Sequence, residues 1–141
     1  KGGYHYGIDI GNARGTPVIA ETGVVDIFQL SASAQYGYET TSPIILKDDG
    51  YYYSCGWGAA GLNAYGGLQN VDIYQKMMFP RGAVMKFFGQ FSTYIDRFTR
   101  VAVSEDNRVY AWGYGANYNI ETNNTLNYAL PVDVTPSVFS A

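Results

Sequence analysis

Residues 101–116, Val-Ala-Val-Ser-Glu-Asp-Asn-Arg-Val-Tyr-Ala-Trp-Gly-Tyr-Gly-Ala, contain the pattern that decides the fold of this chain. The stretch begins as an apolar strand pattern, passes through an acidic turn, and ends in an aromatic strand followed by glycines. Residues 44–59, Ile-Ile-Leu-Lys-Asp-Asp-Gly-Tyr-Tyr-Tyr-Ser-Cys-Gly-Trp-Gly-Ala, show the same order of features 57 positions earlier, without a gap. Similarity at a fixed spacing indicates that the chain contains copies of one structural unit.

Two further correspondences support this repeat. Thr16-Pro17-Val18 and Leu130-Pro131-Val132 lie 114 positions apart, which is twice 57. Residues 23–28 (Gly-Val-Val-Asp-Ile-Phe) resemble residues 82–87 (Gly-Ala-Val-Met-Lys-Phe), with a shift of two positions from the repeat spacing. We therefore expect a short insertion in a loop between these strands.

The local chemistry of both copies is that of β-hairpins. Asp49-Gly50 and Asp106-Asn107 are residue types that tolerate positive φ between two strands. The flanking Val, Ile, Leu and Tyr residues favour a half-buried pleated surface, and no long window shows a helical period. We predict an all-β fold with strands near residues 17–20, 23–29, 43–47, 51–55, 83–88, 99–103 and 108–112.

The composition excludes several classes of protein. The 141 residues carry a net charge of −3, and their nine Lys and Arg form no stripe that could neutralise a nucleic-acid backbone. The apolar runs are too short to enter a membrane. A single Cys and a single His exclude an internal disulfide framework and a zinc finger. Because the chain begins with Lys1 rather than Met, we expect it to be cut from a longer one.

The repeated pattern, apolar-x-apolar-x-x-Asp-Gly-x-x-Tyr-x-Trp-Gly, resembles the regulator-of-chromosome-condensation repeat. The best match covers residues 101–113, and the second covers residues 44–56, where Cys55 occupies the Trp position. Each unit of that family forms one four-stranded blade of a β-propeller. The resemblance therefore implies antiparallel, propeller-blade-like sheets, in which Gly56, Trp112 and Gly113 have structural roles.

We expect the chain to form a single β domain that is built from repeat units. Residues 1–16 correspond to the end of a preceding unit, residues 17–73 and 74–130 to two full units, and residues 131–141 to the start of the next. Propellers of this family close with about seven blades. We therefore expect the chain to be part of a longer one, to be covered by a partner, or to form a homo-oligomer, such as a trimer of two-blade chains.

Function is expected in the polar loops at 30–42, 59–72 and 114–129, because loops on a rigid frame carry most binding residues. These segments are rich in Gly, Asn, Ser, Thr and Tyr, which are typical of adaptable binding surfaces. Tyrosine rings also stack on sugars. The candidate binding residues lie in these loops, directly beside one of them or near the N-terminus. They are Tyr4, His5, Tyr6, Tyr36, Tyr38, Trp57, Tyr114, Asn117, Tyr118 and Asn119.

This composition is similar to that of phage tail-fibre tips. The first functional hypothesis is accordingly a non-enzymatic binding or adhesion module, of the kind that recognises a host as a viral or phage tail protein. Its partner would be a cell-surface glycan or protein receptor, and it would lie on a virion or an extracellular surface. The second hypothesis, which the repeat resemblance implies, is a fragment of a propeller scaffold or of a GTPase exchange factor.

A third hypothesis comes from the N-terminus. His5-Tyr6-Gly7-Ile8-Asp9 followed by Gly15-Thr16-Pro17-Val18 resembles the start of lysostaphin-type zinc peptidases, a likeness that implies His5 and Asp9 as zinc ligands. A catalytic zinc needs a third protein ligand, which that family takes from a later His-x-His, and His5 is the single histidine here. We therefore predict no metal, cofactor or catalytic residue, and at most a degenerate domain of a cell-wall hydrolase.

Overall fold

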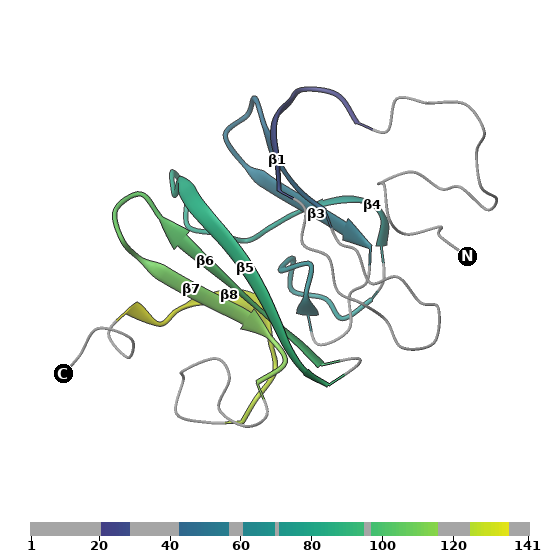
Figure 1. The fold of residues 1–141 in the computed structure, drawn as a ribbon. Helices are drawn as coiled ribbons and strands as arrows, with labels where there is room; N and C mark the ends of the chain where they lie inside the picture. Colours follow the sequence, from purple (N-terminus) through teal and green to yellow (C-terminus); the bar gives the residue numbers. More distant parts are fainter. Residues whose placement is uncertain are drawn as a thin grey trace.

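The computed structural model describes residues 21–28, 43–56, 61–69, 71–94, 97–115 and 125–135. Within these ranges the chain forms two four-stranded antiparallel sheets that lie side by side (Figure 1). Sheet 1 contains, in spatial order, β1 (Val24–Phe28), β2 (Ile44–Lys47), β3 (Tyr52–Gly56) and β4 (Val71–Lys76). Sheet 2 contains, in the same order, β5 (Met85–Tyr94), β6 (Arg97–Ser104), β7 (Val109–Gly113) and β8 (Tyr128–Asp133). The prediction of an all-β fold with blade-like antiparallel sheets is confirmed.

The 57-residue spacing relates the two sheets strand by strand. The bounds of β3 and β7 differ by 57 positions at both ends, and so do the bounds of β4 and β8. Backbone hydrogen bonds repeat as well. Met77 N–H donates to Tyr52 O at 2.8 Å, and Val134 N–H, 57 positions later, donates to Val109 O at 2.8 Å. We call two positions that are 57 apart repeat-equivalent.

The outer strands β4 and β8 are absent from the predicted strands, because their sequences carry weak strand signals. β4 includes Asp72, Gln75 and Lys76 among its six residues. β8 includes Pro131, whose missing N–H is tolerated because β8 lies at the edge of its sheet. The unit boundary drawn after residue 130 falls inside β8, so the repeat unit and the sheet begin at different points.

The alignment between β1 and β5, the first strands of the two sheets, differs from the prediction. Phe28 pairs with Ile44, and Gly89 pairs with Val101. Ile44 and Val101 are 57 positions apart, whereas Phe28 and Gly89 are 61 apart. The likeness of residues 23–28 to residues 82–87 therefore does not give the true alignment, which the pairing with the next strand determines.

The tight turns between the central strands have the predicted conformation. Gly50 has φ = 82° and Asn107 has φ = 65°, the left-handed region that Gly and Asn enter at the lowest cost. Gly50 N–H donates to Lys47 O at 2.9 Å, and Asn107 N–H donates to Ser104 O at 3.0 Å. The strand expected at residues 17–20 lies outside the described residues.

The two sheets stack face to back around one apolar core. Side chains alternate between the two faces of a strand, so Ile44 and Tyr52 of sheet 1 point toward Ala102 and Trp112 of sheet 2. The residue that is repeat-equivalent to Ile44 is Val101, and it points away from sheet 1. Both sheets thus face the same way, as successive blades of a propeller do.

Aromatic rings fill the space between the sheets. Phe79, in the connection from β4 to β5, lies edge-on to Trp112, with the ring centroids 5.4 Å apart. Phe88 of β5 approaches Phe28 of β1 with ring centroids 4.8 Å apart. Such tilted and edge-to-face pairs add stability beyond the area that they bury.

A second apolar cluster lies on the face of sheet 2 that points away from sheet 1. It consists of Val109, Ala111 and Val134, with Val101, Val103, Tyr128 and Val132 packed around them. We call this surface the outer face of sheet 2. Its members Val101, Val103, Val109, Ala111 and Val134 are repeat-equivalent to Ile44, Leu46, Tyr52, Ser54 and Met77, which face sheet 2 from sheet 1.

No helix among the described residues is long and apolar enough to cross a membrane.

Candidate binding site

The strand ends that flank the predicted binding loops in the sequence lie at one end of the sheets. In sheet 1, β1 ends and β2 begins at the paired residues Phe28 and Ile44, and Gly56 at the end of β3 pairs with Val71 at the start of β4. In sheet 2, Gly113 pairs in the same way with Tyr128. We call this the loop end of the molecule. The opposite end, with the turns at Gly50 and Asn107, is the turn end.

Most of the predicted binding residues lie in the sequence between these strand ends or before β1, outside the described residues. These are Tyr4, His5, Tyr6, Tyr36, Tyr38, Trp57, Asn117, Tyr118 and Asn119. Their role in binding therefore stays a prediction. So does the zinc-peptidase hypothesis, which depends on His5 and Asp9.

Tyr114 is the candidate binding residue that the structure describes, and its backbone is tightly held. Its N–H donates to Phe98 O at 2.9 Å, and its carbonyl accepts a hydrogen bond from Thr99 Oγ1 at 2.6 Å. The next residue, Gly115, donates its N–H to Asn127 Oδ1 at 2.9 Å. Asn127 thus joins the two ends of the loop between β7 and β8. The sequence analysis did not single it out.

Gly113 allows the chain to leave β7 at this point. Its φ is 99°, and a Cβ atom there would lie 2.6 Å from the Phe98 carbonyl oxygen. Gly56 has the repeat-equivalent position and a φ of 96°. Both glycines therefore meet a conformational requirement where a strand ends.

A buried turn at residues 61–64 links the two sheets at the loop end. The carbonyl oxygen of Leu62 accepts one hydrogen bond from Trp112 Nε1 at 3.0 Å and another from Arg100 Nη1 at 3.1 Å. Trp112 and Arg100 belong to sheet 2, whereas the turn follows β3 of sheet 1. One backbone carbonyl therefore fixes the position of both side chains.

Asn63 fastens the same turn to sheet 1. Ser54 Oγ donates to Asn63 Oδ1 at 3.1 Å, and Asn63 Nδ2 donates to the Gly56 carbonyl at 3.2 Å. Both side chains are fully buried, so these hydrogen bonds replace the water that the polar groups lose. Asn63 comes from a segment that the sequence analysis treated only as a polar loop.

Arg100 is the one charged side chain among the fully buried residues of the described part. Its Nε donates to Gln90 Oε1 at 2.8 Å, in addition to the hydrogen bond from Nη1 to Leu62 O. Burial lowers the pKa of Arg100 to about 9, and Cys55 acts in the opposite direction. The signal that could have found Arg100 is the alternation of Phe98, Arg100 and Ala102, which places the arginine on the buried face of β6.

Cys55 lies buried in the position that corresponds to Trp112. Burial raises the pKa of the nearby Tyr74, and a hydrogen bond with Cys55 raises it further. The described residues contain no group of three or more His, Cys, Asp or Glu side chains that could hold a metal ion.

The acidic residues at the turn end take part in turn structure. Asp49 accepts hydrogen bonds from Tyr53 Oη at 2.6 Å and from Tyr51 N–H at 2.9 Å. The hydrogen bond from Tyr53 is the larger cause that lowers the pKa of Asp49, and the same contact raises the pKa of Tyr53 to about 12. In sheet 2, Asp106 accepts a hydrogen bond from Ser104. Both aspartates are exposed, as expected for solvated turns.

Two pairs of repeat-equivalent positions form different interactions in the two sheets. In sheet 1, Lys76 Nζ lies 3.3 Å from the ring centroid of Tyr51, which is a cation–π contact. In sheet 2, the equivalent residues are Asp133 and Arg108, which form an ion pair. The backbone is therefore conserved between the sheets where the side-chain chemistry is not.

The stacked sheets define a protein of the β-propeller type, and comparison with solved structures supports this class. The crystal structure of human WBSCR16 is similar to this chain, with a TM-score of 0.56 and 20% sequence identity. The similarity covers 91% of this chain and 32% of that one, so this chain spans about a third of the length of WBSCR16. This likeness shows the fold alone, which is all-β with propeller-like antiparallel sheets. No family model and no curated protein matches the sequence.

Proposed function

We propose that this chain is a non-enzymatic binding module, in which two propeller-type sheets form a rigid frame and the loop end binds the partner. The observation that carries the proposal is the anchoring of the loop end. The Leu62 carbonyl joins the two sheets, and both backbone polar groups of Tyr114 are hydrogen-bonded. Loops that start from fixed points lose less conformational entropy when they bind.

The residues at this end suit a neutral, polar partner. Residues 114–119 read Tyr-Gly-Ala-Asn-Tyr-Asn and carry no charge. Tyrosine supplies a large contact area with few rotatable bonds, and Asn side chains both donate and accept hydrogen bonds. A cell-surface glycan or protein receptor fits this chemistry. The composition extends the proposal to host recognition by a tail-type viral protein.

The proposal is tested with a double variant, Tyr118→Ala with Asn119→Ala, which removes two side chains from the segment between β7 and β8 in the sequence. We expect binding to a glycan array and to intact bacterial cells to be lost at an unchanged melting temperature. The matched control is Tyr51→Ala, which removes a tyrosine at the turn end, where its ring contacts Lys76. That variant should bind as the parent chain does. Full binding by the double variant would overturn the assignment of the site.

The fold likeness to WBSCR16 favours a second candidate function, that of a propeller scaffold or an exchange factor for a small GTPase. This function would use the same frame but a protein partner. A nucleotide-exchange assay with the purified chain and a panel of small GTPases separates the two candidates. Accelerated release of a fluorescent guanine nucleotide would place the second candidate first.

A further inference from the structure

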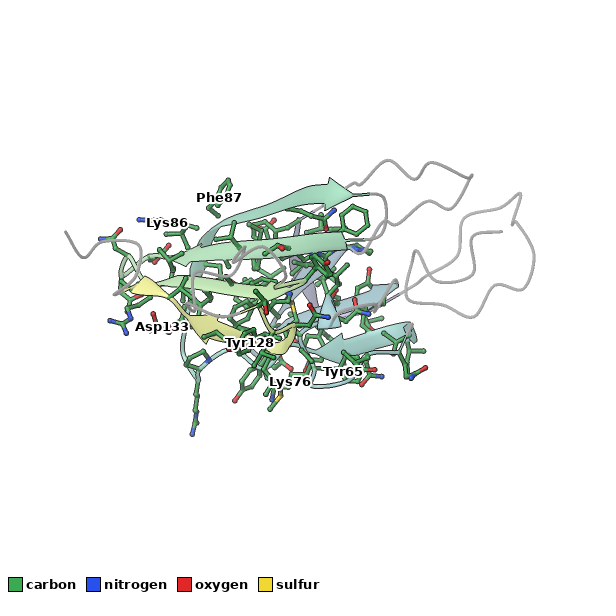
Figure 2. The ribbon with its side chains drawn as sticks, turned by 90° about the horizontal axis from the view of Figure 1, so that it is seen from below. Tyr65, Lys76, Lys86, Phe87, Tyr128 and Asp133 are labelled. Carbon is green, nitrogen blue, oxygen red and sulfur yellow. The ribbon has the colours of Figure 1, made fainter. Side chains whose placement is uncertain are left out.

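Three segments on the side of the outer strands each expose a large apolar side chain. Leu68 follows the buried turn and is 59% exposed, Met78 lies between β4 and β5 and is 55% exposed, and Leu130 of β8 is 46% exposed. Figure 2 shows Tyr65, from the same segment as Leu68, on the side of the outer strands, and Phe87 on the opposite side. We call the surface of Tyr65, Leu68, Met78 and Leu130 the Leu68 patch.

Backbone contacts hold the three segments of the Leu68 patch together. Met78 N–H donates to the Ala64 carbonyl at 2.9 Å, and Gly66 N–H donates to the Ala129 carbonyl at 3.0 Å. A Cβ atom at Gly66 would lie 3.5 Å from Leu130 Cδ2. The segment that carries Tyr65 therefore touches both of the other segments, and the exposed side chains belong to one continuous surface.

The patch is fixed in position, and its polar groups have partners within the chain. Tyr65 Oη accepts a hydrogen bond from Gln69 N–H at 3.3 Å, which closes the loop around Leu68. Covering the ring of Tyr65 would therefore leave no hydroxyl without a hydrogen bond, so the cost of removing it from water is small. Because the backbone is already held, little conformational entropy is lost when a partner binds.

The charge pattern of these segments favours a second copy of the chain as the partner. Residues 61–69, 77–80 and 125–132 contain no Asp, Glu, Lys, Arg or His, although the whole chain carries a net charge of −3. Two copies carry the same net charge and repel each other, but a contact through these segments brings no like charges together. An anionic membrane would favour Lys or Arg beside the apolar residues. Leucine and methionine also offer a sugar no hydroxyl, amide or aromatic ring.

We propose that two copies of this chain form a two-fold dimer through the Leu68 patch. A two-fold contact uses the same surface on both copies, so that surface must be complementary to itself. An uncharged patch of leucine, methionine and tyrosine meets this requirement. The contact removes the exposed apolar area of Leu68, Met78 and Leu130 from water in both copies, which supplies the driving force. Because each copy has one such patch, assembly stops at two.

The proposal goes beyond the binding function, because it uses the outer side of the molecule and not residues 114–119. Two single variants test it, Leu68→Lys and Leu130→Lys, which place a charge in the patch from two different segments. Both side chains are well exposed, so both variants should keep the melting temperature of the parent chain. The control is Phe87→Lys, which changes a residue that is 54% exposed on the opposite side (Figure 2).

Sedimentation velocity of the full chain, across a wide range of concentration, gives the readout. We expect the parent chain and Phe87→Lys to pass from monomer to dimer as concentration rises, with no larger species. Leu68→Lys and Leu130→Lys should each stay monomeric over the same range. An equimolar mixture of these two variants should stay monomeric as well, because every pairing of their patches contains a buried charge.

Several outcomes would overturn the proposal. A parent chain that stays monomeric at every concentration has no such contact, and one that forms species larger than a dimer uses a different one. Association in the mixture of Leu68→Lys and Leu130→Lys would indicate a head-to-tail contact. Loss of the dimer in Phe87→Lys would place the contact on the opposite side.

Flotation with vesicles of phosphatidylcholine and phosphatidylserine examines the competing occupant of the patch. We expect the parent chain to stay unbound. Binding that Leu68→Lys abolishes would identify a membrane surface as the partner and would overturn the dimer. None of these outcomes affects the binding proposal, whose test changes Tyr118 and Asn119.

Discussion

The Leu62 carbonyl allows a quantitative test of how the two sheets are joined. It accepts hydrogen bonds from Trp112 Nε1 and Arg100 Nη1, at 3.0 Å and 3.1 Å. Trp112→Phe removes the first bond, which contributes about 1 kcal/mol, and leaves a smaller ring in a fully buried site. Truncation of a buried Trp to Ala costs about 3–5 kcal/mol. We therefore expect Trp112→Phe to lower the free energy of unfolding by about 2–3 kcal/mol.

The sharper expectation concerns the double variant of Trp112→Phe with Arg100→Met. In each single variant the Leu62 carbonyl keeps one of these two hydrogen bonds. The double variant removes both of these donors from the buried oxygen, and a buried unpaired group costs about 1–3 kcal/mol. The double variant should therefore lose about 1–2 kcal/mol more than the sum of the single losses.

Urea denaturation followed by far-ultraviolet circular dichroism measures these energies without using the fluorescence of Trp112. With a denaturant slope of about 2 kcal/mol per M, Trp112→Phe alone should move the midpoint down by about 1 M. The control cycle pairs Trp112→Phe with Tyr53→Phe, which removes a hydroxyl that donates to Asp49 Oδ2 at the turn end. That pair should be additive. Additivity within about 0.3 kcal/mol in the Leu62 cycle would refute the shared-acceptor reasoning.

Two further predictions concern glycine positions and acid stability. Gly61 and Gly50 have similar φ values, 85° and 82°, but a Cβ at Gly61 would overlap the backbone of Ala129, whereas one at Gly50 meets nothing within 4 Å. By urea denaturation, Gly50→Ala should cost about 1 kcal/mol and Gly61→Ala more than about 3 kcal/mol. Folding lowers the pKa of Asp49, so this carboxylate stabilises the fold above its unfolded pKa of 3.8. The difference in melting temperature between the parent chain and Asp49→Asn should therefore vanish as the pH falls through the folded pKa of Asp49.

The central strands and their turns could be predicted because their signals are local. The turns at Gly50 and Asn107 need residues that tolerate positive φ, and the sequence shows such residues between apolar runs. The outer strands β4 and β8 could not be found in this way. They lie at sheet edges, where polar residues and Pro131 are tolerated and the alternation of buried residues is weak.

The alignment of β1 with β5 illustrates another limit of sequence comparison. Gly23 and Gly82 begin two similar segments, yet the backbone partner of Asp48 is Gly23 and the partner of the repeat-equivalent Glu105 is Val84. Pairing with the neighbouring strand determines register, because a shift along the strand changes which side chains are buried. Likeness between two short segments does not contain that information.

The candidate site shows the same division between local and distant information. Tyr114 and Gly113 could be selected from the sequence because a strand ends there. Asn63 could not. For Arg100 the alternation along β6 indicates a buried face but not the partners, because these lie on other elements. Arg100 contacts Leu62, which is 38 positions away in the chain. No pattern within one unit of the repeat reveals a contact between two units.

The sequence by itself determined the repeat, the hairpin turns and the all-β class, since each depends on backbone preferences of residues close together in the chain. Only the tertiary structure decided that the sheets stack face to back. It also decided that Trp112 donates a hydrogen bond to the carbonyl of Leu62, which lies 50 positions away in the chain, at the loop end. Stacking places the Ile44 face of sheet 1 against sheet 2. The repeat-equivalent Val101 of sheet 2 points away from sheet 1. The physical reason is that packing between sheets depends on which faces meet, and the residues of a single strand do not specify that.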